Sequence, residues 1–241
     1  MAPFWIFADM SRGSSFTITA DSKVRRFCFH CLVTVILTLP TGFYTLPAQE
    51  TPVPRLTFTK TLKGSSPEYM ALSIDAHGKG TYDSRKLDDP PAPRPLQISA
   101  GTTARIFSLA ESLNDFRSLD LNSHHKVANM GLKTLTYEAG KEINKVQYNY
   151  TENRTAQQLA DLLEKIGNVE EQIIQLEYEM KYDHLSLPQD LSQIEEGLDE
   201  HNFIEAALLI PTLDKISTNP HFMHLAQARA QELVHRIQEN K

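Results

Sequence analysis

Apolar and polar side chains alternate along two short stretches near the start of the first half of the chain. Residues 55–62, with the sequence RLTFTKTL, alternate leucine and phenylalanine with three threonines. Residues 69–74, with the sequence YMALSI, repeat the alternation. Because successive side chains of a strand point to opposite faces, this spacing predicts two half-buried β-strands.

The stretch HGKG at residues 77–80 could be a phosphate-binding loop or the turn of a hairpin. A phosphate-binding loop leads directly into a helix, whereas HGKG leads into the alternating stretch TYDSRKL. We therefore interpret it as a hairpin turn, with a returning strand that starts at Tyr82. Residues 88–95, DDPPAPRP, are expected to form an extended connector, because proline cannot donate a hydrogen bond to a neighbouring strand.

The periodicity then changes to that of a helix and back again. Residues 98–116, ISAGTTARIFSLAESLNDF, place their apolar side chains at helical spacing, with Ser99 or Thr102 near the start. Residues 133–151, KTLTYEAGKEINKVQYNYT, read as a second hairpin that turns at residues 139–142. The order strands, helix, strands predicts an α+β fold: a small antiparallel sheet with one packed helix.

A long amphipathic helix is predicted from residue 155 to residue 183. Thr155 and Gln158 match a capping box at its start. Apolar residues then recur at steps of three and four, and they are Leu159, Leu163, Ile166, Val169, Ile173, Leu176 and Met180. This near-heptad seam either packs inside the chain or pairs with a second chain, and we favour packing inside the chain.

Three further helices complete a predicted C-terminal bundle. The first follows Pro188, and the second covers residues 203–216. Pro211 is expected to kink or divide the second helix. The third is expected to open at Asn219 and Pro220.

The first 48 residues are typical of an export signal. A basic cluster at residues 23–26 precedes an apolar run at residues 27–39, and Ala48 is the expected residue before cleavage. Alternatively, residues 27–46 form an uncleaved membrane anchor of about 20 residues. Pro40 and Gly42 interrupt that segment, which favours cleavage. The predicted organisation is a signal (1–48), a sheet domain (49–154) and a helical region (155–241).

Cysteine content and charge narrow the range of functions. Cys28 and Cys31, the two cysteines of the chain, lie in the predicted signal, so the exported chain would have no disulfide. This fits a bacterial periplasm or envelope. Residues 49–154 hold 14 Lys/Arg and 12 Asp/Glu, a net charge of +2, whereas residues 155–241 hold 6 and 16, a net charge of −10. The acidic second half would repel phosphates, so we expect no nucleic-acid partner.

The sheet region resembles a family of bacterial exported domains of unknown function. The resemblance rests on residues 65–83 (SSPEYMALSIDAHGKGTYD), the proline-containing gap, the helix that ends in LNDF and the second hairpin. That family has a cysteine-containing loop before a Pro-x-Tyr strand. Pro67 and Tyr69 match this strand here, but the cysteines are missing. The resemblance covers residues 56–166, and it implies export and an α+β fold but no activity.

Motifs of catalysis and metal binding are weak in this sequence. No serine lies in a Gly-x-Ser-x-Gly motif, and the exported chain has no thiol. We expect His124 and His125 to lie in a solvated loop. His221 and His224 could share a helical face, but HFMH lacks the glutamate of the HExxH motif. We therefore predict neither a metal site nor a cofactor.

Carboxylates and tyrosines are the remaining candidates for a functional surface. Four acidic residues of the long helix fall mainly off the apolar seam and are expected on a solvated face: Glu170, Glu171, Glu177 and Glu179. Four tyrosines of the sheet region are candidates for a shared exposed binding groove: Tyr69, Tyr82, Tyr137 and Tyr148.

These observations favour an exported, non-enzymatic interaction module. We expect a monomer, located in the periplasm or envelope or secreted, whose partner is a protein or another envelope component. One alternative is a structural protein that oligomerises through the long helix. Another is a hydrolase whose site is assembled from residues far apart in the sequence.

Overall fold

The computed structural model describes residues 52–239 except residue 124. The predicted export signal (1–48) and the alternative membrane anchor (27–46) lie outside the described residues. The described residues form one compact unit.

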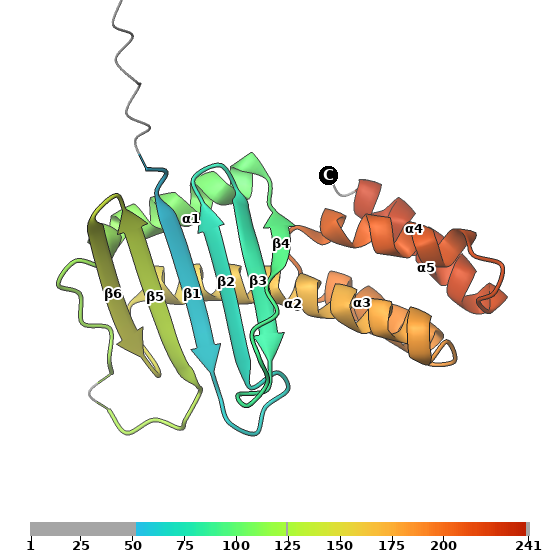
Figure 1. The fold of residues 1–241 in the computed structure, drawn as a ribbon, viewed down its shortest axis with the longest axis horizontal. Helices are drawn as coiled ribbons and strands as arrows, with labels where there is room; N and C mark the ends of the chain where they lie inside the picture. The colour runs from blue at the N-terminus through green and yellow to red at the C-terminus, as the bar shows by residue number, and fades with distance from the viewer. Residues whose placement is uncertain (1–51, 124, 240–241) are drawn as a thin grey trace, which may run out of the picture. The chain divides into compact units, whose positions relative to one another are not determined.

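Six antiparallel strands form one sheet in the order β4-β3-β2-β1-β5-β6 (Figure 1). The strands are β1 (Arg55–Thr61), β2 (Tyr69–Asp75), β3 (Lys79–Arg85), β4 (Arg94–Gln97), β5 (Leu132–Ala139) and β6 (Glu142–Tyr148). Each alternating stretch of the sequence became a strand, because one set of its side chains can be buried while the other set faces water.

Two helices cover the same face of this sheet. The side chains of Leu56, Phe58 and Leu72 are fully buried there, against α1 (Ala100–Ser112) and the first half of α2 (Arg154–Tyr182). Figure 1 shows both helices behind the strands. The α+β fold is confirmed, but the sheet packs against two helices where the sequence suggested one.

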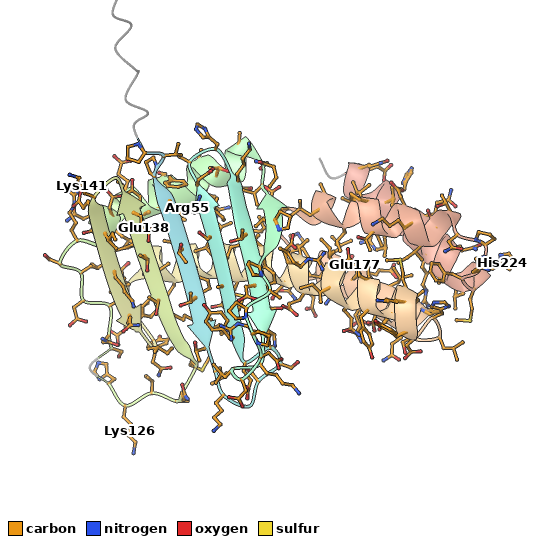
Figure 2. The ribbon with its side chains drawn as sticks, in the orientation of Figure 1. Arg55, Lys126, Glu138, Lys141, Glu177 and His224 are labelled. Carbon is orange, nitrogen blue, oxygen red and sulfur yellow. The ribbon has the colours of Figure 1, made fainter. Side chains whose placement is uncertain are left out.

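No described helix covers the opposite face of the sheet, which is polar. Its central row consists of hydroxyl side chains on four adjacent strands, because Ser73 pairs with Thr81 and with Thr57, and Thr57 pairs with Thr136. The hydroxyls of Thr57 and Ser73 lie 3.0 Å apart. Arg55 and Glu138, also paired, project from this face in Figure 2.

The first predicted hairpin is confirmed, and the connector after it holds an additional strand. The amide of Gly78, which has a φ of 78°, donates to the carbonyl of Asp75, and β2 and β3 pair on either side. The proline-rich segment, predicted as a connector up to residue 95, ends in β4. Pro95 is accepted there because β4 is an edge strand with only one neighbour.

The long helix is present, but its cap differs from the prediction. Asn153, rather than Thr155, is the N-cap, and its side chain accepts a hydrogen bond from the amide of Ala156. The apolar seam is buried within the chain as expected, apart from Met180, which is partly exposed.

Two hydrophobic clusters share α2. Its buried apolar residues up to Ile166 belong to the cluster of the sheet, and those from Val169 belong to the cluster of the C-terminal helices. These helices are α3 (Leu187–Asp199), α4 (Ile210–Thr218) and α5 (His224–Glu239). Gly167 lies where α2 passes from one cluster to the other. A Cβ atom added there would come within 2.7 Å of the Met70 sulfur. The boundary predicted at residue 154 therefore does not separate two domains.

The C-terminal helices begin at different residues from those predicted. The segment predicted as one helix is divided beside Pro211, as one of the two alternatives expected, into a short 3-10 helix (Ala206–Leu209) and α4, and the proline lies in the first turn of α4. The last helix starts at His224, after a turn in which Asn219 accepts a hydrogen bond from the amide of His221.

Replacing Ile173 by aspartate tests whether α2 depends on the helices of its own chain. Ile173 is buried in the second cluster, so Ile173→Asp should lower the free energy of unfolding by about 4 kcal/mol or more, because it buries an unpaired charge. Tyr178→Asp is the matched control, since that side chain of the same helix is 56% exposed. Urea denaturation measures both changes. A dimer by light scattering that Ile173→Asp converts into a folded monomer would contradict packing within the chain.

Candidate functional site

The four candidate tyrosines do not form a shared surface, which corrects the prediction. Tyr82 and Tyr148 are buried on the face of the sheet covered by helices. Tyr137 is half-buried on that face, with its ring 6.3 Å from the ring of Phe107. Tyr69 lies on the opposite, uncovered face, where Arg85 stacks over it. Alternation along the strands sends neighbouring side chains to opposite faces, and aromatic rings gain most by burial in the core.

The described candidate histidines are not placed on one helical face. His221 precedes α5 and His224 begins it, so the two do not share a helical face. His125 lies in an exposed loop, 3.6 Å from a carboxylate oxygen of Glu152, and His124 lies outside the described residues. Within the part of the chain that the structure describes, no three His, Cys, Asp or Glu side chains are grouped to hold a metal ion.

Two of the four acidic residues of α2, Glu170 and Glu179, are buried rather than solvated. Glu171 accepts a hydrogen bond from the Tyr82 hydroxyl at 2.6 Å, and Glu177 accepts one from Arg94 at 2.8 Å. Glu170 is only 5% exposed and Glu179 only 2%. The prediction of a solvated face is therefore wrong for Glu170 and Glu179. Elements pack on more than one side of α2, so positions away from the apolar seam are covered as well.

The carboxyl group of Glu179 is held between α2 and α3. Gln175 donates a hydrogen bond to its Oε1 at 2.9 Å, whereas Oε2 is buried without a partner among the described residues. Burial, followed by the neighbouring Asp190 of α3, raises the pKa of Glu179 to about 7. Burial also raises the pKa of Glu170. Both carboxyl groups take up a proton more readily in the folded chain than in the unfolded chain.

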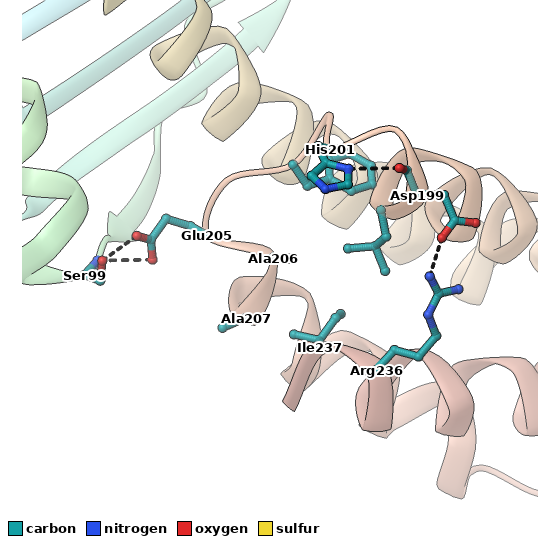
Figure 3. Close-up of a pocket in the computed structure, with 10 residues that line it drawn as sticks. Ser99, Asp199, His201, Glu205, Ala206, Ala207, Arg236 and Ile237 are labelled. Carbon is teal, nitrogen blue, oxygen red and sulfur yellow. Dashed lines mark hydrogen bonds and ion pairs between the residues drawn. The ribbon is translucent and has the colours of Figure 1, made fainter. Parts of the chain in front are cut away.

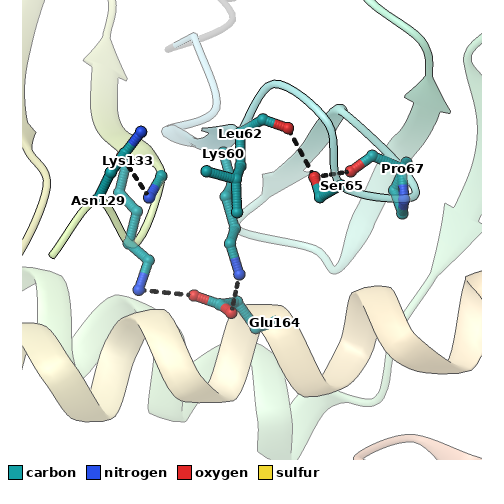
Figure 4. A network of polar contacts seen from close by, with 8 residues as sticks. Lys60, Leu62, Ser65, Pro67, Asn129, Lys133 and Glu164 are labelled. Atoms are coloured by element: carbon teal, nitrogen blue, oxygen red, sulfur yellow. Dashed lines mark hydrogen bonds and ion pairs between the residues drawn. The ribbon is translucent and has the colours of Figure 1, made fainter.

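Glu164 behaves in the opposite way, because two lysines of the sheet reach it. Lys60 of β1 lies 2.7 Å from one carboxylate oxygen and Lys133 of β5 lies 3.0 Å from the other (Figure 4). Burial alone would raise the pKa of Glu164, but the two lysines outweigh burial and lower it. This charge network fastens α2 to the sheet.

A polar groove runs along α2 between the β1–β2 loop and α3. It consists of two adjoining hollows of about 190 and 670 Å³ that share Ser66, Pro67, Asn168 and Glu171. Amides and carboxylates line it. No histidine or cysteine is among its described lining residues. Two of its six lining carboxylates, Glu164 and Glu171, accept hydrogen bonds from lysine and tyrosine side chains. The groove offers hydrogen bonds to a polar ligand.

A second hollow, of about 690 Å³, lies beside the connection between α3 and the 3-10 helix Ala206–Leu209 (Figure 3). Ser99, the N-cap of α1, donates to Glu205 through its hydroxyl at 2.5 Å and through its amide at 3.2 Å. Glu205 has a left-handed backbone with a φ of 67°. Arg236 bonds to Asp199 across the hollow. These polar groups bond to one another, so they hold the connection in place.

The helices end in an apolar surface that the sequence interpretation missed. The α2–α3 turn and the α4–α5 turn lie at the same end of the C-terminal helices (Figure 1), and the rings of His184 and Phe222, one from each turn, are 5.0 Å apart. Five exposed apolar side chains belong to this end, which we call the helical tip: Tyr178, Tyr182, Leu185, Met223 and Leu225.

The helical tip contains the most exposed large apolar side chain among the described residues, Leu185, at 77%. The rings of Tyr178 and Tyr182 pack against each other with their centroids 5.0 Å apart. In the sequence, the only signal was two tyrosines four residues apart and off the apolar seam, followed by a leucine in a turn. Large exposed apolar patches mark interaction sites more often than isolated apolar residues do.

The raised pKa of Glu179 gives a testable dependence of stability on pH. Between its ordinary value of 4.5 and about 7, the folded chain holds the proton more tightly than the unfolded chain. Stability is therefore highest at the lower pH and falls as the pH rises through this range. Glu179→Gln, which keeps an acceptor for Gln175 and cannot ionise, should stabilise the chain at pH 8 by on the order of 3 kcal/mol and not at pH 5.

Urea denaturation at both pH values measures this difference. Glu196→Gln is the matched control, because Glu196 is exposed on α3 and should leave the pH profile unchanged. The assignment fails if Glu179→Gln and the parent chain lose the same stability between pH 5 and pH 8.

Comparison of the chain with models of known protein families and with curated protein sequences found no match to either. The function must therefore be argued from the chain's own surfaces.

Proposed function

We propose that this protein is an exported, non-enzymatic interaction module that binds an envelope component through its helical tip. The observation that carries the proposal is the presence of five exposed apolar side chains in the two turns and the adjoining helix ends at one end of α2–α5. Leaving large apolar side chains in water is costly. A surface of this kind is best explained by a partner that covers it.

The composition of the helical tip supports a binding role. Tyrosine and methionine are enriched in the centres of protein interfaces, where lysine and glutamate are depleted. Here two tyrosines and a methionine lie among leucines. Tyr178 and Tyr182 lie one helical turn apart on α2, whose other side is fixed in the core, so the helix presents their rings on a rigid support.

The polar surfaces support a non-enzymatic role less directly. The groove along α2 lacks a histidine or cysteine among its described lining residues, and Ser99 and Glu205 in the second hollow bond to each other. One observation favours the hydrolase alternative: Glu179 has a raised pKa beside Asp190, as general acids do. However, Glu179 is 2% exposed and would have to be uncovered before it could reach a substrate.

Oligomerisation through the long helix has less support than binding through the tip. The seam that could have paired with another chain is covered by the sheet and by α3–α5 of the same chain. We therefore propose that the protein is a monomer at micromolar concentration, since partners within one chain avoid the entropy cost of association.

Export is proposed from the pattern of the first 48 residues, in which a basic cluster, an apolar run and a small residue follow one another. None of the described helices is both long and apolar enough to cross a bilayer.

Serine substitutions test the role of the helical tip. The variant with Tyr178→Ser, Tyr182→Ser and Leu185→Ser should keep its circular dichroism and stability, because all three side chains are exposed. It should no longer retain the membrane or protein component that the parent chain retains from envelope extract. The matched control carries Val127→Ser, Met130→Ser and Leu132→Ser, three exposed apolar residues near the start of β5. Equal retention by all three proteins would refute the role of the tip.

Mass spectrometry of the exported protein tests the signal. Cleavage after Ala48 should give an N-terminus within a few residues of Gln49. Intact chains that carry residues 27–46, recovered in the membrane fraction, would instead show an anchor.

A further inference from the structure

The exposed apolar side chains of the helical tip belong to the ends of two helices and to the turns beside them. Tyr178 and Tyr182 are on the last turns of α2, Leu185 is in the turn that follows, and Met223 and Leu225 stand at the start of α5. The contact between His184 and Phe222 holds the two turns together. A surface that meets the helices end-on would therefore contact both turns.

Charge distinguishes the helical tip from the rest of the C-terminal helices. Residues 155–241 have 6 Lys/Arg and 16 Asp/Glu, a net charge of −10. At the tip, in residues 178–186 and 219–225, the charged side chains are Lys181, Asp183 and the buried Glu179. Lys181 and Asp183 cancel each other. A negatively charged surface would therefore repel the remaining helical surface and accept only the tip.

The polar groups around the apolar side chains are suited to phosphate. The Lys181 ammonium lies 4.8 Å from the centre of the Tyr182 ring, so a cation sits directly beside an aromatic side chain. His221 and His224 are exposed close to Met223, and each imidazole has at least one N–H donor. Tyrosine rings are enriched where a bilayer meets water, because they combine an apolar body with a hydroxyl, and lysine side chains extend toward the head groups.

From this juxtaposition we infer that the helical tip docks end-on onto a phospholipid surface. Leu185, Met223 and Leu225 enter the edge of the hydrocarbon region, Tyr178 and Tyr182 lie at the interface, and Lys181 meets phosphate. This inference rests on the proposed function, because it names the partner of the same surface. Because the charges of Lys181 and Asp183 cancel, peripheral binding of this kind depends mainly on the apolar area that it buries.

A single tryptophan placed at the helical tip tests the inference. The chain contains one tryptophan, Trp5, so the full chain with Trp5→Phe and Leu185→Trp has its fluorophore only at the tip. On addition of vesicles of phosphatidylethanolamine and phosphatidylglycerol, its emission should shift to shorter wavelength. Brominated phosphatidylglycerol should then quench the emission.

The matched control is the full chain with Trp5→Phe and Met130→Trp, because Met130 is 54% exposed but lies near the start of β5. The control should show neither change, even if residues 27–46 hold the chain on the vesicle. Equal quenching at both positions, or none at residue 185, would overturn the inference.

The same measurements separate this inference from the proposed function. If residue 185 is not quenched but the serine variant of the tip loses a protein from envelope extract, then the partner is a protein and the proposed function stands. If neither quenching nor retention depends on the tip, both proposals fail.

Discussion

Burial of the 29-residue helix α2 on more than one side is the constraint on which the rest of the structure depends. Its first half closes the core of the sheet, and its second half forms the centre of the C-terminal helices. Because one continuous helix belongs to both cores, the two parts cannot move apart without breaking helical hydrogen bonds or exposing apolar surface. The ion pairs of Glu164 with Lys60 and Lys133 fix the first half against the sheet.

The two-sided packing of α2 also places carboxyl groups in contrasting surroundings. Glu164 lies between two lysines and its carboxylate is stabilised, whereas Glu179 faces Gln175 and Asp190 and its protonated form is stabilised. Protonation of Glu164 therefore weakens the attachment of α2 to the sheet. Protonation of Glu179 instead removes a buried charge where α2 meets α3. The folded unit is therefore best preserved at a pH at which Glu179 is protonated and Glu164 is still ionised.

The strands, the sheet-packed helix and the buried seam could be predicted because each follows from a local period of two or 3.6 residues. The buried positions of Glu170 and Glu179 could not, since their burial depends on elements that approach α2 from other directions. The prediction of a shared tyrosine surface was wrong for the same reason. Whether Tyr69 and Tyr82 lie on one face or on opposite faces of the sheet depends on the register of β2 and β3. The helical tip arises from two turns about 40 residues apart in sequence, so no single stretch could reveal it.

The edges of the sheet have a consequence for how the protein behaves when crowded. At one edge, β4 is four residues long and contains Pro95, and at the other, Lys145 lies in the middle of β6. A proline cannot donate a hydrogen bond to an incoming strand, and a lysine at an edge must lose hydration when another sheet approaches. Edge-to-edge pairing of two sheets, the first step toward fibres, is therefore opposed at both edges of the sheet. The row of hydroxyls on the uncovered face can stay open to water without making the molecule prone to aggregate.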